Sequence, residues 1–125
     1  NLIGGNLSII CSSLGTENEI DTRNKILFIE EIGEEPYKVD RMLLQLVQAG
    51  KINDCAGIIF GYFSSCEPSN PNQSLTISEI IEELLKPLGK PIIAGVACGH
   101  SLPSLTLPKG VEVVIDSKNK NIKII

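Results

Sequence analysis

Two apolar runs, residues 26–29 and 56–60, constrain the fold most. The first is unbroken, too short for a buried helix and composed of strand-forming residues. Between the runs, residues 36–50 carry apolar side chains at helical spacing, from a proline that suits the first turn of a helix to a glycine at the end. We therefore predict buried strands over residues 25–31 and 56–63 with a helix between them.

The same spacing predicts two more helices, over residues 6–14 and from Ser78 to a stop at Pro87 and Gly89. A third strand is predicted over residues 91–96. Three short strands are predicted after it, over residues 104–107, 111–115 and 121–125. Helices that alternate with strands indicate an α/β domain, with a mixed sheet, flanking helices and a small strand-rich C-terminal part of the swivelling β/β/α type.

Composition places the chain among ordinary globular domains. The 125 residues are 42% hydrophobic, which suffices for one domain around one core. The net charge of −4 and the absence of any basic cluster argue against a nucleic-acid partner. No apolar run approaches the roughly 20 residues that span a bilayer, so we expect no membrane partner.

The chain begins without Met and without a secretory signal pattern, so we expect it to be part of a longer protein. Its four cysteines form no Cys-x-x-Cys pair, and there is one histidine, so we predict no metal site. Free thiols in a reducing compartment, the cytoplasm, are expected. Two disulfides remain an alternative.

The single histidine, His100, follows the third predicted strand, at the edge where open α/β sheets place their ligands. Glu30 and Glu31 end an earlier predicted strand, so one carboxylate is expected beside His100, where it would orient the imidazole. Successive strand side chains alternate, so we expect that Glu30 and Glu31 do not both turn inward. A histidine in a surface loop is the alternative.

A nucleophile is harder to find. No Gly-x-Ser-x-Gly elbow surrounds any serine, and Cys98 near His100 is more typical of a small buried hydrophobe. Asn6 follows Gly4 and Gly5 at a helix start, which suits either an anion held by backbone N–H groups or simple capping.

The chain resembles the LD-carboxypeptidase family over nearly its whole length. The similarity lies in residues 4–8 (Gly-Gly-Asn-Leu-Ser), 14–16, 26–34, 36–37, 40–43 and 57–61, in Phe63, in Gly99-His100, and in Leu107, Pro108 and Gly110. Members of that family are two-domain serine peptidases that remove the terminal D-alanine from murein tetrapeptides in peptidoglycan recycling.

The resemblance implies that residues 1–125 form the C-terminal domain, with the serine nucleophile in an N-terminal domain that lies outside this chain. Glu30 and His100 match the family's catalytic acid and histidine, and Asn6 matches a position that faces the substrate. It further implies no cofactor, a murein peptide as substrate, the missing N-terminal domain as partner, a homodimer for the full-length protein, and an inactive isolated chain.

Two departures from the family pattern bear on specificity. Glu31 stands where Asp is more usual, and residues 96–98 replace an aromatic-containing stretch before Gly99. A related activity, hydrolysis of microcin-type peptide nucleotides, therefore stays open. Two alternatives come from other classes: a swivelling domain that carries phosphate on His100, and a noncatalytic module.

Overall fold

Four parallel strands form the central sheet of the computed structural model, which describes residues 1–125. They are β1 (Leu2–Asn6), β2 (Ile26–Ile32), β3 (Gly57–Ser64) and β4 (Ile92–Ile93), and they lie in the order β1-β2-β3-β4. Because all four run parallel, their carboxyl ends meet at one edge of the sheet. Asn6, Glu30 and Ser64 lie at this edge.

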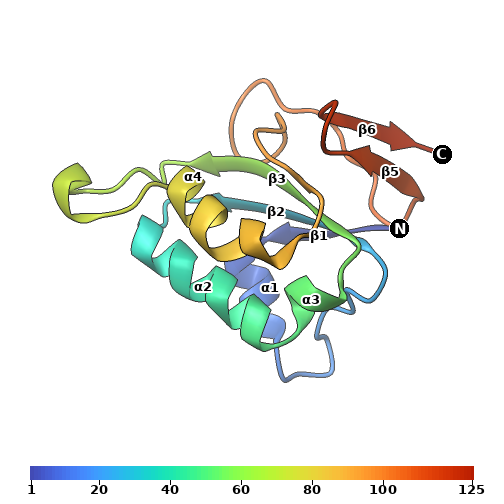
Figure 1. The fold of residues 1–125 in the computed structure, drawn as a ribbon, viewed down its shortest axis with the longest axis horizontal. Coiled ribbons are helices and arrows are strands. Elements are labelled where there is room, and N and C mark those ends of the chain that lie inside the picture. The colour runs from blue at the N-terminus through green and yellow to red at the C-terminus, as the bar shows by residue number, and fades with distance from the viewer.

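Helices cover one face of the sheet (Figure 1). They are α1 (Leu7–Ser13), α2 (Pro36–Gln48), α3 (Lys51–Asp54) and a last helical stretch made of α4 (Ile77–Ile80), η2 (Ile81–Leu85) and η3 (Lys86–Leu88). A short 3₁₀ turn, η1 (Pro71–Gln73), lies in the loop after β3. The core on this side joins apolar side chains of α1, α2 and α3 to Leu27, Ile29 and Phe60 of the strands.

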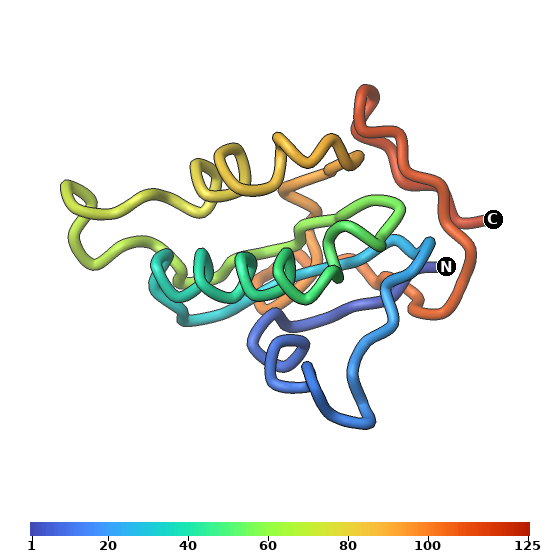
Figure 2. Tube along the Cα trace, turned by 60° about the horizontal axis from the view of Figure 1, so that its bottom comes forward, coloured from blue at the N-terminus to red at the C-terminus, as the bar shows by residue number.

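The other face of the sheet is covered by the C-terminal third of the chain. Phe28 and Ile59 point to this side, where they pack with Cys98, Leu107 and Ile115. The hairpin of β5 (Val113–Asp116) and β6 (Asn121–Ile124) is antiparallel and lies on the side of the sheet opposite the helices (Figure 1). Figure 2 shows the hairpin at the end of the molecule where the N-terminus lies. Strand alternation thus sends alternate residues of β2 into two separate apolar layers.

The structure confirms the α/β class and the strand-rich C-terminal part, with the parallel and antiparallel strands in two separate sheets. Our prediction missed β1, whose Gly4 and Gly5 have φ angles of +124° and +155° and interrupt any apolar pattern. The third predicted strand is confined to Ile92–Ile93. The strand predicted over residues 104–107 is wrong, because this stretch pairs with no strand.

Candidate functional site

The structure brings Glu30 and His100 together across 70 residues of sequence. Nδ1 of His100 lies 2.7 Å from Oε2 of Glu30. The carboxylate side chain is 7% exposed, whereas the imidazole is 51% exposed, so a buried acid holds a ring that faces outward. An ionised carboxylate only accepts hydrogen bonds, so the neutral imidazole carries its proton on Nδ1 and leaves the lone pair of Nε2 free.

Two glycines allow this pairing. Gly99 has a φ of +135°, and a Cβ atom there would lie 3.1 Å from Oε2 of Glu30 and 3.3 Å from the Cβ of Tyr62. Gly61 lies against the backbone of Cys98, whose carbonyl oxygen would be 2.3 Å from a Cβ at position 61. Both positions therefore require glycine for the chain carrying His100 to pass this close to the sheet.

Strand β3 contains a β-bulge opposite Glu30. Ile29 pairs with Phe60, but Glu31 pairs with Phe63, so β3 has one extra residue opposite Glu30. Within this bulge, the backbone N–H of Tyr62 donates to the carbonyl of Cys98 at 2.8 Å. Bulges of this kind re-aim strand ends near functional sites, and this one anchors the loop that carries His100.

Two side chains of β3 make further hydrogen bonds to this loop. The hydroxyl of Tyr62 donates to the carbonyl of Pro103 at 2.8 Å, and the hydroxyls of Ser64 and Ser101 are hydrogen-bonded to each other. His100 thus lies in a loop that is hydrogen-bonded to β3 on both sides of the imidazole. His100 is itself exposed, so the alternative of a histidine in a surface loop also describes its place in the structure.

Glu31 makes a separate polar cluster on the helical face. Its carboxylate accepts hydrogen bonds from Asn6 Nδ2 at 2.7 Å, from the backbone N–H of Ser8 at 2.8 Å, from the Ser8 hydroxyl at 2.6 Å and from the backbone N–H of Ile32 at 2.9 Å. Burial raises the pKa of this carboxyl, but these hydrogen bonds outweigh burial, and the pKa lies below its ordinary value.

The structure corrects one expectation about the two acids. Glu30 and Glu31 do point to opposite faces of the sheet, yet both are buried, with 5% and 2% exposure. Our prediction that they do not both turn inward is wrong because both faces of the sheet are covered. The role of Glu31 was missed for the same reason, and the nearest sequence signal was its position next to Glu30.

Asn6 caps helix α1. Its Oδ1 accepts from the backbone N–H of Ile9 at 3.2 Å, while its Nδ2 donates to Glu31. The capping alternative therefore explains the Gly-Gly-Asn stretch. Asn6 also pairs with Glu30 in the register of β1 and β2, so its backbone lies beside the candidate acid.

All four cysteines are free thiols. Burial raises the pKa of the Cys98 thiol, and the nearby Glu30 carboxylate raises it further. Cys98 also contacts a hollow of about 160 Å³ between Phe28 and Leu107. These surroundings suit a small apolar side chain and disfavour a thiolate nucleophile.

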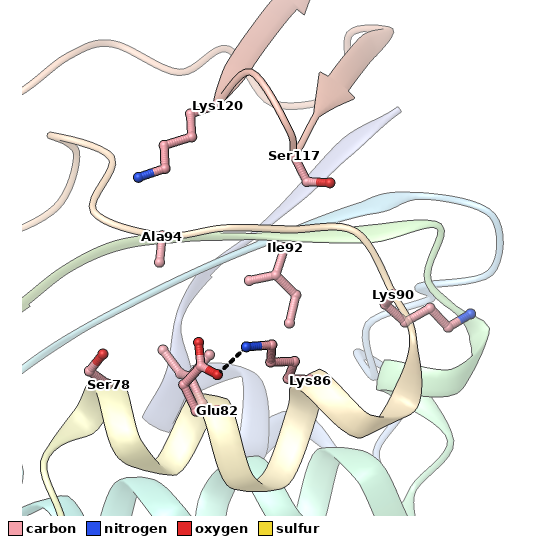
Figure 3. Close-up of a pocket in the computed structure, with 9 residues that line it drawn as sticks. Ser78, Glu82, Lys86, Lys90, Ile92, Ala94, Ser117 and Lys120 are labelled. Atoms are coloured by element: carbon pink, nitrogen blue, oxygen red, sulfur yellow. Dashed lines mark hydrogen bonds and ion pairs between the residues drawn. The ribbon is translucent and has the colours of Figure 1, made fainter.

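A larger groove, of about 410 Å³, lies between the last helical stretch and the β5–β6 hairpin (Figure 3). It contains no residue of the Glu30–His100 pair. Lys86 in its wall is paired with Glu82 at 2.6 Å, and Lys90 donates to the carbonyl of Asn53 at 2.6 Å. With two of its lysines already committed to partners within the chain, the groove is a poor candidate for an anion site.

No helix in the structure has both the length and the apolar character needed to cross a membrane.

Residues 1–115 match the family model of the LD-carboxypeptidase C-terminal domain. A probable murein peptide carboxypeptidase of Bacillus subtilis is 44% identical over 123 residues, which is 98% of this chain and 39% of the relative. The microcin C7 self-immunity protein MccF of Escherichia coli is 32% identical over 98% of this chain and 36% of its own length.

A solved structure agrees with these matches. The muramoyltetrapeptide carboxypeptidase of Oxalobacter formigenes superposes with a TM-score of 0.81 and 34% identity, over 90% of this chain and 40% of that protein. The chain therefore spans about two fifths of the length of these relatives, or less.

Proposed function

The chain belongs to the LD-carboxypeptidase family, as its C-terminal domain, and on that premise we propose that it supplies the acid and the histidine of a Ser-Glu-His triad. Glu30 is the acid and His100 the base. The serine nucleophile comes from the remainder of the complete protein, and Asn6 faces the substrate. The reaction is hydrolysis of the L,D bond to the terminal D-alanine of a murein tetrapeptide.

In this mechanism, Nε2 of His100 accepts the hydroxyl proton as the serine oxygen attacks the carbonyl carbon before D-alanine. His100 then gives that proton to the leaving amine, and water attacks the acyl-enzyme in a second, equivalent step. Glu30 holds the ring by Nδ1 and stabilises the imidazolium that forms in each step. The C–N bond that breaks is replaced by a C–O bond from water.

One observation carries the proposal: the 2.7 Å contact between His100 Nδ1 and Oε2 of buried Glu30. It gives the imidazole the tautomer that a general base requires, with Nε2 free at a half-exposed position. A phosphate-carrying histidine would be disfavoured here, because the carboxylate beside the ring repels a phosphoryl group.

The test follows release of D-alanine from a murein tetrapeptide by mass spectrometry, with the complete gene product that contains these residues. His100→Ala and Glu30→Gln each lower kcat by about 10²- to 10⁴-fold, because each removes general-base assistance. Glu67→Gln, at an exposed glutamate, is the matched control and retains activity. Full activity in His100→Ala contradicts the assignment.

The isolated 125-residue chain is expected to release no D-alanine, because it lacks the proposed serine nucleophile. A mixture of this chain with the inactive His100→Ala complete protein is also expected to be inactive, unless the chain takes the place of the C-terminal domain that carries the substitution.

A second candidate is hydrolysis of microcin-type peptide nucleotides, which the 32% identity to MccF over 98% of the chain favours. The same triad serves both reactions. Parallel assays with a murein tetrapeptide and a peptidyl nucleotide separate them: the physiological substrate has the higher kcat/KM.

We also propose that the complete protein acts in the cytoplasm, in peptidoglycan recycling, and as a homodimer. The family membership supports these proposals, and sedimentation of the complete protein tests the last of them.

A further inference from the structure

Glu31 is a buried carboxylate that the proposed mechanism does not use. Its four hydrogen bonds come from Asn6, from the backbone and hydroxyl of Ser8, and from Ile32. No lysine or arginine forms an ion pair with it. A buried charge without a counter-ion is costly unless hydrogen bonds compensate it, so this carboxylate depends on its four donors.

The network fixes the orientation of the Asn6 amide. A carboxylate offers only acceptors, so Nδ2 of Asn6 must face Glu31, and Oδ1 faces the N–H of Ile9. Turning the amide over would set Oδ1 against the carboxylate and Nδ2 against an N–H donor. One Nδ2 hydrogen remains unused, and its direction follows from the two bonds that hold the amide plane.

The backbone of Asn6 lies beside that of the candidate acid, Glu30. Asn6 and Glu30 are register partners in β1 and β2, so the two residues lie side by side at the carboxyl edge of the sheet. The negative charge of Glu31 helps to raise the pKa of two nearby thiols, those of Cys11 and Cys66. The site around Asn6 therefore combines a fixed amide with the carboxylate of Glu31.

We infer that Glu31 is a positioning residue: it holds the Asn6 amide so that the free Nδ2 hydrogen meets an oxygen acceptor of the peptide substrate, a carbonyl or carboxylate oxygen. The inference rests on the proposed function, because it requires a peptide beside Glu30 and His100. It assigns Glu31 to substrate binding and not to proton transfer, since Glu31 lies on the face of the sheet opposite the Glu30 side chain.

Glutamine cannot replace Glu31 in this network. Oε1 accepts from the N–H of Ile32 and Oε2 from the N–H of Ser8, and neither backbone donor can turn away. Whichever position an amide nitrogen takes, it faces one of these N–H groups. Glu31→Gln therefore loses one charge-assisted hydrogen bond and loosens Asn6, and we expect kcat/KM to fall about 10- to 100-fold.

The loss should appear in KM, with kcat and the pH profile of kcat close to those of the wild type, because Glu30 and His100 are untouched. Glu31→Asp keeps the charge and should restore part of the loss. A fall in kcat with unchanged KM would overturn the inference.

A double-mutant cycle in the complete protein tests whether Glu31 acts through Asn6. Asn6→Ser removes the amide but retains a good helix cap. If Glu31 positions the amide, Glu31→Gln has little further effect on KM in the Asn6→Ser background. Equal effects in both backgrounds would mean that Glu31 has only a structural role.

If the Glu31→Gln variant does not fold, Ser8→Ala is used in its place in the double-mutant cycle. It removes one of the two Ser8 donors to Glu31 and leaves the backbone N–H in place. A rise in KM that vanishes in the Asn6→Ser background supports the inference, and a rise that persists there contradicts it. Circular dichroism verifies that each variant is folded.

The two proposals fail in different ways. If the wild-type protein hydrolyses neither a murein tetrapeptide nor a peptidyl nucleotide, the proposed function fails, and the positioning role fails with it. If the wild type is active but the cycle is additive, only the positioning role of Glu31 is refuted.

Discussion

Replacing Gly99 with alanine should separate Glu30 from His100 without touching either residue. The new Cβ would lie 3.1 Å from Oε2 of Glu30, and 3.3 Å from the Cβ atoms of both Glu30 and Tyr62. Favourable carbon–carbon contacts lie at about 3.5–4.0 Å, so these carbons must separate by about 0.2–0.7 Å. Because Glu30 is buried and His100 is exposed, we expect the His100 loop to move outward.

The backbone adds a cost of its own. Gly99 has a φ of +135°, a region that alanine rarely adopts. Such strain costs about 1–3 kcal/mol of the free energy of unfolding. A misplacement approaching 1 Å in catalytic geometry costs about 10²-fold in rate, so we expect a loss of about 10- to 100-fold in kcat for the complete protein.

Gly15→Ala is the matched control. Gly15 also has a positive φ, +78°, but no atom lies within 4 Å of the position of its Cβ. It should lose about 1–2 kcal/mol of stability from the left-handed backbone alone and retain full activity. Comparison of the two variants separates backbone strain from crowding at Glu30.

Two assays report on the result. D-alanine release gives kcat, and ¹⁵N chemical shifts of the imidazole in the 125-residue chain report which nitrogen carries the proton, without ambiguity because the chain has one histidine. Wild type should show the Nδ1–H tautomer and Gly99→Ala a mixture. Unchanged kcat together with an unchanged tautomer would refute the argument that Gly99 is needed for the pair.

Three further predictions concern stability and reactivity. Leu43→Ala should lower the free energy of unfolding by about 2–5 kcal/mol, because Leu43 is fully buried, whereas Leu44→Ala, at a side chain 41% exposed, should cost about 0.5 kcal/mol or less in the same urea titration. In the folded chain the pKa of Glu31 is lower than its ordinary 4.5, so ionised Glu31 adds to the free energy of unfolding at pH values above 4.5. This contribution is lost as the pH falls through the lowered pKa of the folded state. Glu31→Gln should remove this pH-dependent loss of stability. Iodoacetamide should modify Cys98 first, as seen by peptide mass mapping, because it is the only partly exposed cysteine, while Cys11 is buried with a pKa of about 11; faster labelling of Cys11 would contradict the structure.

The elements that sequence predicts well are those whose pattern depends on a single buried face. Helix α2 has Val39, Leu43 and Leu46 fully buried at helical spacing, and its predicted start at Pro36 is confirmed. Strand β2 is confirmed within one residue, because an apolar run buried on both faces has few other solutions. Strand β1 carries no such signal. Gly4 lies so close to Phe28 that no side chain fits at this position, and glycine adds nothing to an apolar pattern.

The candidate site was predictable in part. The positions of Glu30 and His100 past apolar runs predict that both lie at the same edge of the sheet, and the family resemblance implies the roles that we propose for them. Their 2.7 Å contact depends on Gly99, Gly61 and the bulge in β3, which no local pattern reveals. Residues that are 70 positions apart come into contact only when the chain is folded, and such a contact leaves no periodic pattern in the sequence.

Adjacent acids in a strand can serve two different tasks because the pleat separates them. Glu30 faces the C-terminal segment and holds the imidazole, while Glu31 faces α1 and holds Asn6. Both carboxylates lie near the carboxyl edge of the sheet. Each accepts hydrogen bonds from different donors, so the two carboxylates need not share a proton. A one-residue slip of β2 would exchange the two faces and break both networks at once. Opposite Glu30, β3 accommodates one extra residue, whereas β1 and β2 pair in regular register.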